Sequence, residues 1–197
     1  MAVFEKSRQE EQSDDDDLLS EINKGAKDLG GERYPLLYTD GVSEGFVVIR
    51  RFTRFKKRLG KVVTFAMELM VVETDSPDVK PGAIRSVLEG TDKEAWDKRV
   101  SRILMAGLGA TQQDLINEGA TLLAQAYSAD QPMAGVVMGF SNVEAVDKDG
   151  NAKCDKDGNP YVNSQFRQAN AADWKRLQPI VAEIDPSWKP SKIQPGA

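Results

Sequence analysis

Two segments in the first half of the chain have the composition or the spacing of β-strands. Residues 45–52 are rich in β-branched and aromatic side chains, and residues 62–73 place apolar side chains on one face at every second position: Phe65, Met67, Leu69 and Val71. This period of two is typical of β-strands. With residues 57–60 as the turn, the pattern predicts a long hairpin. Pro77 and Pro81 then break the chain, and residues 83–88 are long enough for a third strand.

The apolar spacing changes to a helical one over residues 91–128. One stripe contains Trp96, Val100, Ile103 and Leu104, and a second contains Leu115, Gly119, Leu122, Leu123 and Ala126. Thr91 with Glu94, and Thr111 with Asp114, have the spacing of capping boxes at helix starts. We therefore expect two helices between the third and fourth strands.

The β pattern returns in the second half of the chain. Residues 134–146 form an apolar stretch, and in residues 161–167 one face is polar, with Tyr161, Asn163, Gln165 and Arg167 alternating with other side chains. Residues 171–183 predict a last helix, although Pro179 falls in its middle; its inward residues are Trp174, Leu177, Val181 and Ile184.

Three strands, a helical insertion and two further strands form the order expected of an OB-fold. The fold class predicted is mainly β with helical insertions: a five-stranded, partly open Greek-key barrel, with helices between strands 3 and 4 and at the C-terminus. Ligands of this fold bind on strands 2 and 3 and on two loops. Here those loops are residues 56–61 and 147–160.

Composition narrows the functions that the chain can have. Its 197 residues include one cysteine, Cys154, and no histidine. This excludes an internal disulfide and a multi-cysteine metal site, and it removes the commonest general base. No apolar run reaches the ~20 residues of a membrane span, and the N-terminus is acidic where a secretory signal would be basic. We expect a cytoplasmic protein that is not an enzyme and carries no cofactor.

The charges are segregated along the chain, although the formal net charge is −5. Residues 5–21 contain eight acidic side chains, and residues 50–61 contain seven basic ones and no acidic one. The chain therefore divides into an acidic arm (1–30) that is disordered or weakly helical, a folded domain (31–184) and an extended, proline-containing tail (185–197). The arm acts either as a solubilising segment or as a competitor for the basic residues.

Over about residues 41–168, the chain resembles phage-type single-stranded DNA-binding proteins. The residues that carry the resemblance are the hairpin 45–73, Pro81-Gly82 before the third strand and the late G-x-x-Y-x-N pattern at 158–163. The resemblance implies an OB-fold and single-stranded DNA as the partner, in phage DNA replication or recombination and in the host cytoplasm. Proteins of replication or recombination are further partners that it implies. The acidic run here is N-terminal, whereas such proteins commonly end in an acidic tail.

The basic hairpin is the predicted DNA-binding site, because single-strand binders combine a cationic groove with aromatic stacking platforms. Only one of Phe52 and Phe55 can face outward on a regular strand, and we expect it to be Phe55. Tyr161 and Arg167 share a strand face that a base, sugar or phosphate could meet. The predicted contacts are Arg51, Arg54, Phe55, Lys56, Lys57, Arg58, Lys61, Tyr161 and Arg167.

Other interpretations of these segments remain open. The basic residues could keep a strand edge from aggregating, or could contact an acidic protein partner in a phage or mobile-element adaptor protein. The Asp- and Gly-rich segment 147–160 fails the EF-hand template, which favours a turn-rich hairpin loop over a calcium site. Glu68, Glu73 and Asp75 are close enough in sequence to suggest a carboxylate nuclease site, although acidic strand residues are usually solvated.

Overall fold

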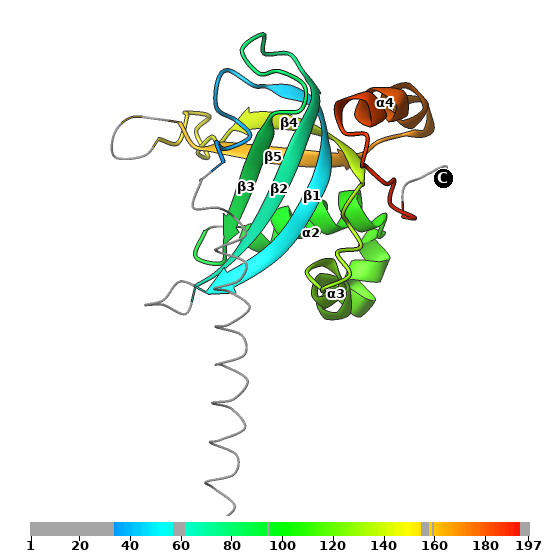
Figure 1. Ribbon diagram of the computed structural model, residues 1–197. Coiled ribbons are helices and arrows are strands. Elements are labelled where there is room, and N and C mark those ends of the chain that lie inside the picture. Colours follow the sequence, from blue (N-terminus) through cyan, green and yellow to red (C-terminus); the bar gives the residue numbers. More distant parts are fainter. Residues whose placement is uncertain (1–33, 57–61, 94, 155–157, 159, 194–197) are drawn as a thin grey trace, which may run out of the picture. The chain divides into compact units, whose positions relative to one another are not determined.

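A computed structural model describes residues 34–56, 62–93, 95–154, 158 and 160–193, without the side chain of Lys56. The predicted acidic arm and the turn at 57–60 lie outside the described residues. The elements of the compact unit Pro35–Ala197 are β1 (Glu44–Lys56), β2 (Val63–Thr74), β3 (Ile84–Gly90), α2 (Trp96–Leu108), α3 (Gln112–Ala126), β4 (Val137–Glu144), β5 (Val162–Gln168) and α4 (Ala171–Ile184) (Figure 1).

The five strands form one antiparallel sheet in the order β3-β2-β1-β4-β5. The predicted mainly β class is therefore confirmed, as are the two helices between the third and fourth strands and the helix at the C-terminal end. No helix in the described part of the chain is long and apolar enough to cross a membrane.

Strand β1 is shared by the two halves of the sheet. It pairs with β2 along its whole length but with β4 only from Glu44 to Val48. Its register against β2 shifts at Phe46/Val47 and again at Ile49/Arg51. Such bulges bend a strand and increase its twist. The edge of β1 that faces away from β2 is its second edge. Beyond Val48, no strand among the described residues pairs with this second edge.

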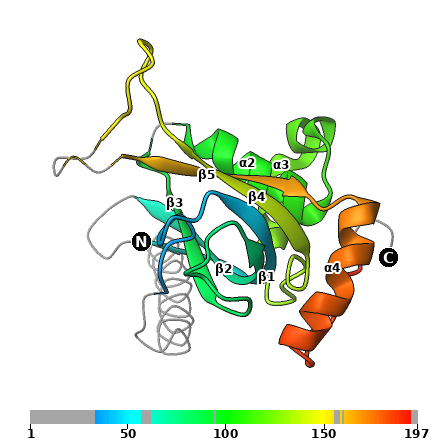
Figure 2. The ribbon, with the colours of Figure 1, turned by 90° about the horizontal axis from the view of Figure 1, so that it is seen from above.

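The main core lies inside the curled sheet, as seen from above in Figure 2. Its largest fully buried side chains include Phe52, Met67 and Leu69. Helix α2 contacts β3, β4 and β5, so it covers this core between the two edge strands. The stripe predicted for α2 is inward: Val100, Ile103 and Leu104 are buried, and Trp96 is partly buried.

The start of α2 differs from the prediction, because Thr91 is not its N-cap, and Glu94, the predicted capping-box partner, lies outside the described residues. Ala95 occupies the N-cap position in a left-handed conformation with no side-chain cap. Thr91 instead pairs with Val63 at the start of β2. Its hydroxyl accepts a hydrogen bond from the Val63 N–H at 3.1 Å, and its own N–H donates to the Val63 carbonyl. Thr91 therefore fixes the start of β2. The Thr111/Asp114 capping box of α3 is confirmed, with both reciprocal hydrogen bonds present.

Helix α4 packs on the outer face of the sheet. Trp174, Leu177 and Val181 are buried there against side chains of β1, β2 and β4, as the apolar spacing predicted, and Pro179 lies on the exposed side of the helix. Residues 185–193 contain two turns and no helix or strand, and they pack against the rest of the fold. The Trp188 indole donates to the Gly135 carbonyl at 3.2 Å, and the Ser191 hydroxyl donates to the Pro132 carbonyl at 3.0 Å.

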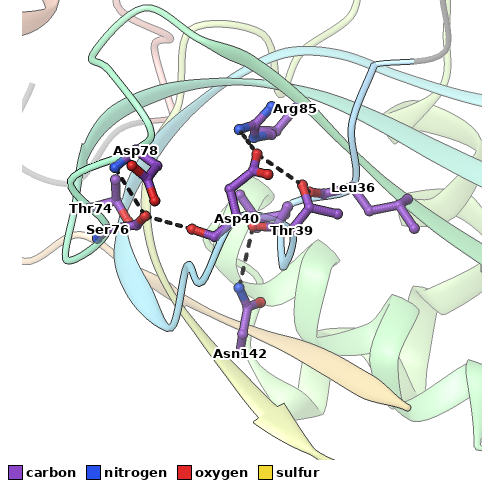
Figure 3. A network of polar contacts seen from close by, with 9 residues as sticks. Leu36, Thr39, Asp40, Thr74, Ser76, Asp78, Arg85 and Asn142 are labelled. Carbon is purple, nitrogen blue, oxygen red and sulfur yellow. Dashed lines mark hydrogen bonds and ion pairs between the residues drawn. The ribbon is translucent and has the colours of Figure 1, made fainter. Parts of the chain in front are cut away.

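A polar network holds the segment before β1 across the sheet (Figure 3). The Arg85 side chain of β3 is only 9% exposed, and its guanidinium pairs with the Asp40 carboxylate at 2.6 Å. The Asn142 amide of β4 donates to the Val42 carbonyl at 2.9 Å. Leu36 bridges Ser86 in parallel, so this segment covers part of the open edge of β3. Arg85 Nε is buried and has no hydrogen-bond partner within the described ranges.

We predict that Asp40→Asn destabilises the protein by about 1–3 kcal/mol, because it leaves the buried Arg85 guanidinium without a counter-charge. The cost lies below that of breaking a fully buried pair, since the Asp40 side chain is half exposed. Glu73→Gln is the matched control. It breaks the surface pair with Arg176, which is worth roughly 0–1 kcal/mol. Urea unfolding measures both, and equal costs for the two variants would contradict a special role of the buried pair.

Candidate nucleic-acid interface

The second half of β1 presents different side chains on its two faces. Directly paired residues of antiparallel strands lie on the same face of the sheet. Phe52 and Arg54 pair with Met67 and Phe65, whose side chains belong to the main core. Phe55, which follows Arg54, pairs with Thr64 on the other face. The predicted contacts of this strand therefore divide between the outer face of the sheet and the face toward the helices.

The two phenylalanines have the separate environments that the strand geometry predicted. Phe52 is 1% exposed and its ring stacks on Phe65, with centroids 6.1 Å apart. Phe65 also stacks on Trp96 of α2, at 6.0 Å. Phe55 is partly exposed and belongs to neither core cluster. Of the two rings, only Phe55 is placed to meet a ligand.

The basic residues of β1 are not equivalent. Arg50 lies 3.4 Å from Glu68 of β2. The pKa of Asp185 is lowered chiefly by a hydrogen bond from Ser187, and the charge of Arg50 adds to that effect. Arg50 is therefore already paired, although no acidic residue is near it in sequence. Arg51 and Arg54 form no ion pair with any carboxylate of the described residues.

Arg54 is oriented by an aromatic ring from the helical insertion. Its guanidinium carbon lies 4.2 Å from the centroid of the Tyr127 ring, just after α3. Tyr127 packs against the main core, whereas Arg54 is exposed. The sequence analysis did not identify Tyr127, because the α3 stripe ends at Ala126 and nothing in the sequence indicates its contact with β1. We call Arg51, Arg54 and Phe55 the hairpin surface.

The other predicted contacts of the hairpin continue beyond this surface. The backbone of Lys56 ends β1, directly after Phe55. Lys57, Arg58 and Lys61 lie outside the described residues. Because the chain is continuous, all four residues follow the hairpin surface within a few positions.

Tyr161 and Arg167 lie on the other arm of the sheet. Strand β5 is separated from β1 by β4, and its hairpin with β4 leaves the sheet at a different place from the end of β1 (Figure 1). The predicted alternation is confirmed, because Phe166 is buried and its neighbours Gln165 and Arg167 are exposed. Tyr161 is 55% exposed.

Arg167 already has partners. Its guanidinium donates to Asp173 of α4 at 2.8 Å, which lowers the pKa of that carboxyl, and it lies 4.8 Å from the Phe46 ring. Arg167 would have to leave Asp173, or share it, to bind a phosphate. Tyr161 is therefore the more available of the two predicted contacts on this arm.

In the hairpin between β4 and β5, Asp147 stabilises a turn. The Asp147 carboxylate accepts hydrogen bonds from the N–H groups of Asp149 and Asn151, and the Asn151 N–H is the main cause of its lowered pKa. No group of three His, Cys, Asp or Glu side chains within the described ranges could hold a metal ion. Cys154 is an exposed free thiol.

The three carboxylates considered for a nuclease site each have a structural partner. Glu68 pairs with Arg50, and Glu73 accepts two hydrogen bonds from Arg176, at 2.6 and 2.7 Å. Asp75 accepts from the N–H groups of Ser43 and Glu44, and the Glu44 N–H is the main reason that its pKa falls to about 2. Each of the three side chains therefore has a structural partner within the fold.

No protein-family model matches this chain, no curated protein is similar to it in sequence, and no solved structure matches its fold.

We predict that Phe55→Ala and Phe52→Ala have different effects on stability. Phe52→Ala empties a core position and costs about 3–5 kcal/mol. Phe55→Ala removes a ring that is outside both core clusters, and we expect a cost below about 1 kcal/mol. Thermal unfolding followed by circular dichroism measures the two changes. A large loss of stability in Phe55→Ala would assign this ring to the core and remove it from the candidate interface.

Proposed function

We propose that this protein binds single-stranded DNA without strong sequence preference, as a non-enzymatic protein built on an OB-fold. The observation that carries the proposal is the hairpin surface. It combines the partly exposed Phe55 with Arg51 and Arg54, which form no ion pair with a carboxylate of the described residues. Single-strand binders pair cations for the backbone with rings for the bases, and every base has a face that can stack.

The OB-fold is proposed from the order of the elements. The strand order β3-β2-β1-β4-β5, a long bent β1 and helices inserted between β3 and β4 are all features expected of a partly open Greek-key barrel. In this assignment, a DNA strand crosses the outer face of β2 and β3 between the hairpin surface and the β4–β5 hairpin. Tyr161 would then offer a second stacking ring at the far end of the path.

The proposal extends to the basic residues at and beyond the end of β1. Lys56, Lys57, Arg58 and Lys61 would add phosphate contacts next to Phe55. A net charge of −5 does not oppose this, because the cations are concentrated in one segment and the acidic residues are largely elsewhere. A role in phage-type DNA replication or recombination, with the proteins of those processes as partners and the host cytoplasm as the location, rests on the sequence resemblance alone.

The experiment is a titration of the full-length protein with fluorescent oligo(dT) and with a duplex of equal length, at several salt concentrations. We predict tighter binding to the single strand. Each single-strand phosphate contact contributes about −0.7 to the slope of log affinity against log salt. Replacing Lys56, Lys57 and Arg58 together by Ala should therefore weaken binding and flatten the slope by up to about 2.

The matched control replaces three exposed lysines elsewhere, Lys175, Lys189 and Lys192, by Ala. It removes the same charge from α4 and the segment after it, and we expect it to leave the slope nearly unchanged. Equal slopes for wild type and the hairpin variant would place the binding surface elsewhere. Binding to neither DNA would contradict the proposal and favour the adaptor interpretation, in which the basic hairpin contacts an acidic protein.

A further inference from the structure

The second edge of β1 is covered by the end of the helical insertion. Pairing with β4 stops at Val48, and residues 127–131 lie beside the continuing strand. The Phe52 N–H donates to the Gln131 side-chain oxygen at 2.8 Å. The amide of Gln131 donates in turn to the Ser128 carbonyl at 2.9 Å. Gln131 has a φ of 45°, a conformation that costs free energy and persists where its surroundings fix it.

Arg54 is the next residue along this edge whose backbone N–H points the same way as that of Phe52, because strand residues alternate in direction. Its side chain extends toward the insertion, and its guanidinium carbon lies over the Tyr127 ring, 4.2 Å from the ring centroid. On the neighbouring strand β2, the paired residue Phe65 stacks on both Phe52 and Trp96 in a near-parallel way, with interplanar angles of 4° and 17°. The guanidinium is therefore supported by the Tyr127 ring, which itself packs against the main core.

A guanidinium that only neutralises a phosphate does not need such support. The planar group stacks on aromatic rings, and RNA- and DNA-binding proteins use arginine planes as stacking surfaces for unpaired bases. Because Arg54 is exposed, the side of its guanidinium away from Tyr127 can be reached from solvent. The ring also restricts the arginine rotamers, so less entropy is lost when a base binds.

We propose that Arg54, held by Tyr127, is a stacking platform for a nucleobase, and that the helical insertion contributes to DNA binding by positioning it. The proposal rests on the proposed single-strand binding and adds to it. Arg51 and Phe55 serve the outer face of β1, and Arg54 serves the face toward α3. A bound strand then passes over the end of β1 and places bases on both sides of it. Tyr127 is a positioning residue in this arrangement.

The test uses Arg54→Lys, which keeps the positive charge and removes the plane. Two probes of equal length are titrated: oligo(dT), and an abasic oligomer that has the same phosphates and no bases. We expect Arg54→Lys to bind the abasic oligomer as wild type does, and to bind oligo(dT) about fivefold more weakly, which corresponds to ~1 kcal/mol of cation–π stacking. Its salt slope on oligo(dT) should equal that of wild type.

Tyr127→Phe and Tyr127→Leu form the second pair. The phenylalanine variant keeps a ring under Arg54 and should bind oligo(dT) as wild type does. The leucine variant removes the ring and should reproduce the selective loss on oligo(dT). Because Tyr127 packs against the core, a folded circular dichroism spectrum is required of both variants. If the leucine variant unfolds, the test relies on Arg54→Lys alone, which changes an exposed residue.

Two results would overturn the inference while the proposed function stands. If Arg54→Lys weakens binding to both probes equally, Arg54 is a phosphate contact whose geometry lysine cannot match. If it binds both probes as wild type does, Arg54 does not touch the strand. If wild type itself binds neither probe, the proposed function fails, and the stacking role fails with it.

Discussion

The sharing of β1 between two partners is the constraint on which the rest of this structure depends. Strand β1 pairs with β2 throughout and with β4 only over Glu44–Val48. Two bulges bend β1 between these two pairings. The bend lets the sheet curl around one core and sends the second half of β1 beyond the reach of β4. An unpaired strand edge invites association with other chains, so proteins cover or charge it. In this protein, residues 127–131 cover part of the edge, and Arg54 places a positive charge beside it.

The covering of this edge also creates the candidate interface. Gln131 satisfies a backbone N–H of β1, and Tyr127 lies beneath the guanidinium of Arg54. On the other face of the strand, Phe55 lies outside both core clusters. Tyr127 therefore belongs both to the segment that covers this edge and, through Arg54, to the proposed interface. The helical insertion has two roles in this account: α2 completes the core, and the residues after α3 shape the ligand surface.

Much of this arrangement could be predicted from local patterns. Period-two alternation identified the hairpin and the polar face of β5, and helical spacing identified the inward residues of α4. Interactions between distant segments had no such signal. Thr91 looked like a helix cap because a threonine hydroxyl serves a helix start and a strand end equally well. Arg50 looked unpaired because Glu68 lies on the neighbouring strand. The bulges and the Arg54–Tyr127 contact depend on the folded geometry.

The measurement that tests this account most directly is a map of backbone amide chemical shifts, recorded by NMR during a titration with oligo(dT). A DNA strand bound at the end of β1 should perturb the amides of residues 51–56 and 127–131 together, because both segments border the same strand edge. The amides of α4, on the outer face of the sheet near the start of β1, should stay nearly unchanged. Perturbations concentrated on α4, with residues 51–56 and 127–131 unaffected, would contradict the account.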